Sequence, residues 1–196
     1  MGCGKSSVGR KLSELLCCPF MDLDAEIEAR KGCTIAKIFA TAGEAEFRRL
    51  EAQTLKDILE TGGRVVALGG GAVMTPECEE MVHGQTICVY LKASVDELVA
   101  RLSSETAGRP LLNTVPTTSH NTSLQAEHHC HVERAERVET SALRTRILNL
   151  MAKRASTYER VAHLIIDTDG KTIDQVASEI AEKTCSIQYT HRSNQS

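Results

Sequence analysis

Tryptophan is absent from this sequence, and aromatic side chains make up only 3% of its 196 residues. Proteins that hold nucleic-acid bases by stacking need aromatic platforms, so this composition disfavours them. An excess of positive charge is lacking as well, because 23 basic residues face 26 acidic ones and give a formal net charge of −3. We therefore expect a globular protein without a nucleic-acid partner.

Long apolar runs are missing too. No stretch approaches the roughly 20 apolar residues that span a bilayer, and no secretory signal opens the chain. The eight cysteines include no Cys-x-x-Cys pair, and several, such as Cys88, lie within apolar stretches. These features predict a cytoplasmic protein with reduced thiols and no membrane partner.

Short apolar runs alternate with amphipathic stretches along the chain. The short runs predict strands at 20–23, 64–68, 86–91 and 164–166. The amphipathic stretches predict helices at 5–16, 24–31, 34–40, 43–61, 143–153 and 172–183, and two more that begin at Pro76 and Ser94. Buried strands that alternate with helices indicate an α/β fold in three layers around a mainly parallel sheet.

Two stretches fall outside this alternation. Residues 113–131 contain few apolar side chains and are expected to form a mobile polar loop. The stretch 186–196 is expected to be a disordered tail. The chain length favours a single domain over residues 1–196.

A glycine-rich pattern lies at the start of the sequence. Residues 2–7, Gly-Cys-Gly-Lys-Ser-Ser, match the second half of the phosphate-binding pattern G-x-x-x-x-G-K-[ST]. In that pattern backbone N–H groups cradle phosphates, the lysine reaches the β- and γ-phosphates, and a hydroxyl binds Mg²⁺. The same residues also fit a myristoylation signal at Gly2 with Cys3 as a palmitoylation site, which would anchor the chain to a membrane.

Two carboxylates follow the first predicted strand. Asp22 and Asp24 lie at its carboxyl end, where open α/β sheets bind their ligands. One carboxylate can hold Mg²⁺, and the other can accept or orient the proton of a substrate hydroxyl. The alternative is that the pair only caps the following helix.

Further along, an arginine and a run of glycines suggest an anion site. Arg48 and Glu51 are spaced i, i+3 on a predicted helix, so the glutamate can hold the guanidinium in place for a carboxylate ligand. The alternative is an ordinary solvated surface pair. Residues 69–71, all glycine, follow a strand and allow a ligand to approach the backbone closely, although they also suit a plain turn.

The order of these motifs resembles the shikimate kinase family, and a membrane anchor would explain none of those that follow the glycine-rich start. The resemblance covers residues 2–112 and about 140–183, and its further elements are Arg109-Pro-Leu-Leu and Arg154-Ala-Ser-Thr-Tyr158. It implies a P-loop kinase fold, with ATP and Mg²⁺ as cofactors. It also implies transfer of a phosphoryl group from ATP to the 3-hydroxyl of shikimate.

The resemblance also implies a role for each matching residue. It assigns ATP binding to Gly2, Cys3, Gly4, Lys5, Ser6, Ser7 and Arg109. It assigns the metal to Ser6 and Asp22, and shikimate to Asp24, Arg48, Gly69, Gly70, Gly71 and Arg154. Catalysis falls to Lys5, Asp24 and Arg109, while Glu51 positions Arg48. Lys171 either borders the adenine pocket or is a solvated turn lysine.

The strand that precedes the phosphate loop in the family is missing here. Its loss would remove about 7–15 kcal/mol of burial, at roughly 1.5–3 kcal/mol for each apolar residue. Folded domains are stable by only about 5–15 kcal/mol. We therefore expect the sequence as printed to be marginally stable alone, and Met1 to be an internal methionine of a longer kinase.

A second departure is the long separation of Arg109 from Arg154. It places a polar insertion, about 113–131, in a lid expected at about 101–139. The run His128-His-Cys-His131 has a spacing poorly suited to metal ligation, so we expect a polar loop rather than a metal site. A monomer is expected. The alternatives are another small P-loop kinase of the gluconate type, or a truncated kinase that binds its ligand without turnover.

Overall fold

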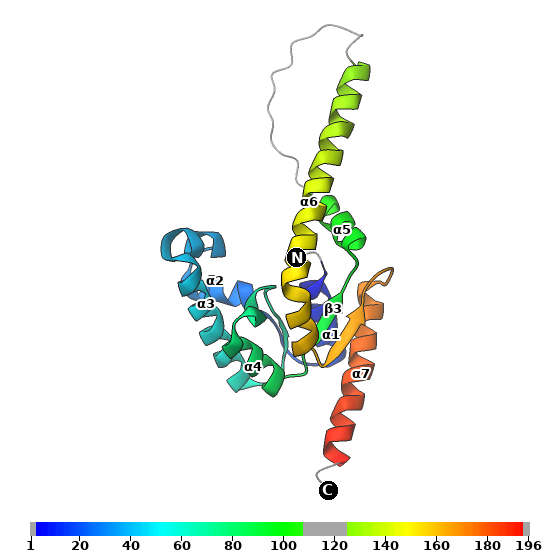
Figure 1. The fold of residues 1–196 in the computed structure, drawn as a ribbon. Coiled ribbons are helices and arrows are strands. Elements are labelled where there is room, and N and C mark those ends of the chain that lie inside the picture. The colour runs from blue at the N-terminus through cyan, green and yellow to red at the C-terminus, as the bar shows by residue number, and fades with distance from the viewer. Residues whose placement is uncertain (1–2, 108–124, 194–196) are drawn as a thin grey trace. The chain divides into compact units, whose positions relative to one another are not determined.

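The computed structural model describes the backbone of residues 3–107 and 125–193, and the side chains of residues 3–103 and 140–186 (Figure 1). Four strands in these ranges form two parallel pairs. β1 (Phe20–Asp22) pairs with β2 (Val65–Ala67), and β3 (Val89–Lys92) pairs with β4 (Leu164–Asp167). Each pair is its own two-stranded sheet, and the long crossovers between partners are those of an α/β protein.

Helices fill the connections between these strands. The first four are α1 (Lys5–Leu15), α2 (Leu23–Lys31), α3 (Ile35–Thr61) and α4 (Pro76–Gln85), with a short 3₁₀ helix η1 (Ala72–Met74) before α4. The remaining three are α5 (Val95–Ala107), α6 (Gln125–Val161) and α7 (Ile173–Ser193). The predicted strands are confirmed to within a few residues, and the parallel pairs with their helices fit the predicted α/β class. None of the helices in the described ranges is long and apolar enough to cross a membrane.

A kink at Gly43 divides α3. Its φ of 80° and ψ of 175° are not helical, and a positive φ of this kind favours glycine. The helix therefore consists of the two segments predicted at 34–40 and 43–61. Thr34 caps the first, accepting a hydrogen bond from the Lys37 N–H.

Two of the expected irregular stretches are wrong where the structure describes them. The backbone of 125–131, expected to be loop, belongs to α6, and the backbone of 186–193, expected to be a disordered tail, belongs to α7. Neither helix contains a glycine or proline, so nothing in the sequence terminates them earlier. Low hydrophobicity was mistaken there for a lack of helical structure. Residues 113–124 of the expected loop lie outside the described ranges.

The chain divides into two compact units, and the single-domain expectation stays a prediction. The first contains Cys3–Ala93 together with Arg154–Ser196, and the second is Ser94–Lys153. The second unit includes the expected lid, 101–139. Within it Leu98, Val99 and Ile147 are buried, and Arg144 forms an ion pair with Asp96.

Two apolar clusters hold the first unit together. One gathers buried side chains of α2, α3 and α4, with Leu23, Ile27 and Leu55 almost completely enclosed. The other gathers buried side chains of α1, α7, β3 and β4, and includes Leu12 and Ile166. The clusters fix the start of α1, the end of β1 and the face of α3, which carry the candidate site residues.

Adjacent isoleucines of β4 test this account of the core. Ile166 is fully buried, whereas Ile165 is 46% exposed. Ile166→Ala is expected to lower the free energy of unfolding by about 2–5 kcal/mol, because it leaves a cavity in the cluster. Ile165→Ala removes the same atoms from the more solvent-exposed face of the strand and is expected to lower the free energy of unfolding by less than about 1 kcal/mol. Urea unfolding of both variants at pH 7 measures the difference, and equal losses would contradict this assignment of faces.

Candidate active site

The start of α1 forms one end of the candidate site. Gly4 adopts a left-handed conformation with φ of 75° directly before the helix, and its carbonyl accepts the Val8 N–H at 2.9 Å. The free N–H groups of the first turn and the positive end of the helix dipole favour a phosphate at this position. Lys5, the first helical residue, adds a cationic side chain, and its Nζ lies 3.7 Å from Cys3 Sγ.

Asp22 joins this helix to the first strand. Ser6 Oγ donates a hydrogen bond of 2.7 Å to its Oδ2. Its Oδ1 accepts the N–H groups of Asp24 at 3.1 Å and Ala25 at 3.4 Å, which caps α2. The helix-capping interpretation is therefore correct for Asp22, but one carboxylate oxygen still faces the Ser6 hydroxyl. A hydroxyl and a carboxylate oxygen side by side are donors of the kind that Mg²⁺ prefers.

Asp24 lies two residues further on, in the first turn of α2, and the side chain that caps this helix is that of Asp22. The half-buried carboxylate of Asp24 packs against the backbone of Gly69, where a β carbon would lie only 2.7 Å from Oδ1. Burial and then the charge of Asp22 raise the pKa of Asp24, while Lys5 and Arg48 oppose the shift. A carboxylate that is partly desolvated in this way is a stronger hydrogen-bond acceptor than one in water.

Arg48 is anchored by a buried carboxylate. Its Nη1 donates to Glu51 Oε2 at 2.7 Å, and Nη2 lies 3.3 Å from Glu44 Oε1. Glu51 is only 1% exposed, so the pair is not the solvated surface pair that its spacing alone allowed. Burial raises the pKa of Glu51, and the hydrogen bond from Arg48 opposes that shift. The guanidinium is thereby held toward Gly71, where a β carbon would lie 2.6 Å from Nη1.

The carbonyl of Gly70 accepts hydrogen bonds from two side chains of α6. Arg154 Nη1 donates to the Gly70 carbonyl at 3.2 Å, and the Tyr158 hydroxyl donates to the same oxygen. The structure therefore brings Asp24, Arg48 and Arg154 together on the 69–71 turn. Tyr158 was not predicted to belong to the site. Its i, i+4 spacing from Arg154 was the available signal, since that spacing puts two residues on one helix face.

Some predicted site residues lie outside this group. Gly2 and Arg109 are not among the described residues, so their ATP-binding roles stay predictions. Ser7 is exposed on α1. Within the described ranges, no three His, Cys, Asp or Glu side chains gather in the way that a metal site requires. The predicted metal ligands Ser6 and Asp22 fall outside that test because one of them is a hydroxyl.

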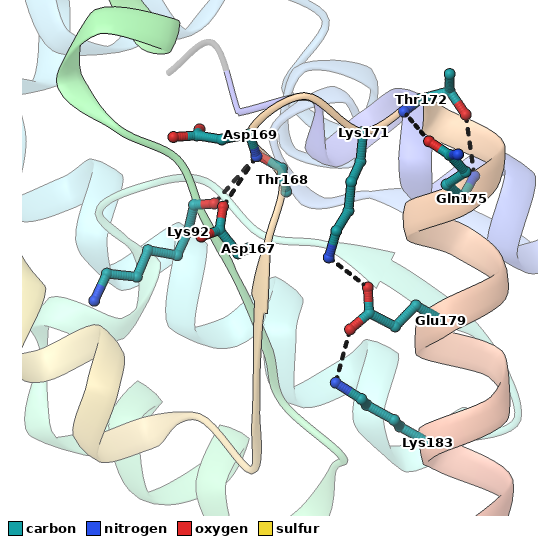
Figure 2. Close-up of polar contacts among 9 residues, drawn as sticks. All are labelled: Lys92, Asp167, Thr168, Asp169, Lys171, Thr172, Gln175, Glu179 and Lys183. Carbon is teal, nitrogen blue, oxygen red and sulfur yellow. Dashed lines mark hydrogen bonds and ion pairs between the residues drawn. The ribbon is translucent and has the colours of Figure 1, made fainter.

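The loop between β4 and α7 holds Lys171 in a defined place (Figure 2). Lys171 Nζ lies 2.7 Å from Glu179, which also pairs with Lys183 at 2.7 Å. A reciprocal capping box of Thr172 and Gln175 begins the helix, with hydrogen bonds of 2.9 and 3.2 Å. Lys171 is thus a turn lysine ion-paired with Glu179, and its place at the border of an adenine pocket stays a prediction.

Taken together, these positions form two ends of one site in the first unit. The start of α1 with Ser6 and Asp22 suits a phosphorylated, metal-bound ligand. The glycine turn with Arg48 and Arg154 suits a small molecule that carries a carboxylate, because guanidinium groups bind carboxylates through paired hydrogen bonds. Asp24 lies at the same turn and is placed to accept a proton from a hydroxyl.

The family model and the similar curated proteins all point to the same family. A family model described as shikimate kinase matches residues 1–185. The shikimate kinase of Chlorobium chlorochromatii is 37% identical over 182 residues, covering 93% of this chain and 85% of that protein. The shikimate kinase of Shewanella sp. strain MR-4 is 35% identical over 183 residues, covering 93% and 91%.

Solved structures agree with these matches. The shikimate kinase of Acinetobacter baumannii in complex with shikimate has a TM-score of 0.72 and 30% identity, covering 95% of this chain and 89% of that one. The shikimate kinase of Bacteroides thetaiotaomicron has a TM-score of 0.72 and 26% identity, covering 94% and 93%.

The raised pKa of Asp24 leads to a prediction about stability. In the folded state its ionised form is disfavoured, so the folded chain loses stability as the pH rises from the unfolded pKa through the folded one. Asp24→Asn is therefore expected to raise the urea midpoint at pH 7, and the gain should vanish below about pH 3, where Asp24 is almost fully protonated in both states.

For a second carboxylate, Asp57, we expect the opposite change in the urea midpoint. A hydrogen bond from Arg30 lowers the pKa of the exposed Asp57, so Asp57→Asn is expected to lower the urea midpoint slightly at pH 7. A midpoint that falls in Asp24→Asn as well would contradict the burial argument for Asp24.

Proposed function

The chain belongs to the shikimate kinase family, and we propose that it transfers the γ-phosphoryl group of ATP to the 3-hydroxyl of shikimate. The observation that carries this proposal is the meeting of Asp24, Arg48 and Arg154 on the 69–71 turn. A hydroxy acid such as shikimate needs both a hydroxyl acceptor and cations for its carboxylate. The predicted kinase fold is confirmed by the structural matches.

Asp24 is proposed to orient the reacting hydroxyl and to accept its proton. Its partial burial and its packing against Gly69 support this role, because both limit the directions in which the carboxylate can point. Arg48 and Arg154 are proposed to bind the carboxylate of shikimate. Because Glu51 fixes Arg48 before any ligand arrives, little side-chain entropy is lost on binding. Positioning of this kind supplies much of the rate in phosphoryl transfer.

The phosphates of ATP are assigned to the start of α1. ATP is the phosphoryl donor of the family, and Lys5 is proposed to bind the transferring phosphate, with backbone N–H groups of residues 4–7 and Cys3 beside it. The Ser6 hydroxyl and the Asp22 carboxylate, 2.7 Å apart, fit Mg²⁺ as hard oxygen donors. That ion, when bound, neutralises phosphate charge. Arg109 is proposed to stabilise the transferred charge from the lid.

Broader expectations about partners, oligomeric state and localisation belong to this proposal. Shikimate and ATP are the proposed small-molecule partners, and the chain is proposed to act as a monomer in the cytoplasm. No nucleic-acid or membrane partner is proposed. The proposal is supported by the net charge of −3 and by the small-molecule nature of the site.

The direct test is ADP release from MgATP with shikimate, gluconate or neither. Shikimate-dependent release is expected, and release that depends on gluconate would favour the gluconate-type kinase instead. Asp24→Asn is expected to abolish release while calorimetry still detects shikimate binding, since the arginines remain. Wild-type protein that binds shikimate without releasing ADP would contradict the proposed kinase activity and support a binding module.

Neighbouring arginines test the carboxylate site. Arg48→Ala is expected to weaken shikimate binding by about 2–5 kcal/mol, because it removes a partly buried cation and leaves the buried Glu51 unpaired. Arg49→Ala changes the next residue, which is 63% exposed and pairs with Glu46 on the surface, and should change binding by less than about 0.5 kcal/mol. Calorimetric titration with shikimate gives both values. Unchanged affinity in Arg48→Ala would remove Arg48 from the site.

A further inference from the structure

The Gly70 carbonyl is a shared acceptor for one helix face. A carbonyl oxygen has two lone pairs, and here the Tyr158 hydroxyl and Arg154 Nη1 occupy both. The two donors are four residues apart on α6, so one face of the helix supplies them together. A β carbon on Gly70 would lie 3.4 Å from the Tyr158 hydroxyl oxygen and 3.5 Å from Arg154 Nη1.

The two donors differ in rigidity. The Tyr158 ring packs against the apolar cluster of α2, α3 and α4, and its centroid lies 5.3 Å from that of Tyr90. Arg154 has a long flexible side chain, and Gly70 provides the one hydrogen-bond acceptor assigned to it within the described residues. The tyrosine therefore fixes where the carbonyl points, and the carbonyl in turn fixes one edge of the guanidinium.

We propose that Tyr158 is a positioning residue, which through the Gly70 carbonyl holds the Arg154 guanidinium in the orientation that receives the substrate carboxylate. This inference rests on the proposed function for the identity of the substrate. Tyr158 does not contact the reacting atoms. Without its hydroxyl, the free lone pair of Gly70 attracts a second N–H of Arg154 and turns the guanidinium away from its ligand.

The experiment separates substrate binding from turnover. Tyr158→Phe removes one hydroxyl and keeps the ring, so the fold is preserved. The KM for shikimate is expected to rise roughly three- to tenfold, which is the effect of losing one hydrogen bond. The kcat and the KM for ATP are expected to stay within about twofold of the wild type, because no transition-state contact is removed.

The matched control is Tyr90→Phe, which alters the ring next to Tyr158 without touching Gly70. It should leave all three kinetic constants unchanged. In an Arg154→Lys background, Tyr158→Phe should add less than twofold to the KM, because the hydroxyl acts through the guanidinium. An unchanged KM in Tyr158→Phe, or its full effect in the Arg154→Lys background, would overturn the proposal.

A second readout needs no substrate and so does not depend on the proposed function. Phenylglyoxal modifies accessible arginines, and mass spectrometry of peptides gives the rate at Arg154, with the exposed Arg49 as internal reference. Tyr158→Phe is expected to lower the Arg154 rate relative to the wild type and Tyr90→Phe, because the Gly70 carbonyl then holds a second N–H of the guanidinium. If the wild type lacks activity on shikimate, the proposed function fails. An unchanged Arg154 rate would then overturn the positioning role on its own.

Discussion

The site depends on one constraint, which is the close approach of three charged side chains to the all-glycine turn 69–71. Asp24 comes from α2, Arg48 from α3 and Arg154 from α6, and each meets a different glycine of the 69–71 turn. α2 and α3 follow one another, whereas α6 lies far from both in the sequence, and side chains of all three pack in the apolar cluster of α2, α3 and α4. The packing of these three helices around the turn therefore fixes how the three charges are arranged.

That arrangement exists before any ligand is present, and it works against stability. Glu51 is buried beneath Arg48, and burial raises the pKa values of both Glu51 and Asp24. Partly desolvated charges of this kind are stabilising only through their partners. Their persistence in the free protein is the usual compromise in which a preorganised site is retained at the expense of folding free energy.

Much of this could be predicted from the sequence, and the failures have physical causes. The spacing of Arg48 and Glu51 predicted a pair, but only the packing of α3 shows that Glu51 is enclosed. Tyr158 was overlooked because its partner is a backbone carbonyl 88 positions away, which no local pattern encodes. The helices over 125–131 and 186–193 were missed because polar composition was read as irregular structure, although no glycine or proline interrupts them.

The crowding at Gly69 and Gly71 also has a genetic consequence. Every amino-acid replacement of a glycine adds a β carbon, and here that atom would meet the tips of Asp24 and Arg48 rather than backbone. The Asp24 tip can move aside without disturbing either apolar cluster, so missense alleles at the Gly69 codon should yield normal amounts of folded protein that lacks function. At Gly71 the displaced Arg48 tip would leave the buried Glu51 unpaired, so alleles there should also lower the amount of protein, as alleles of the buried core do.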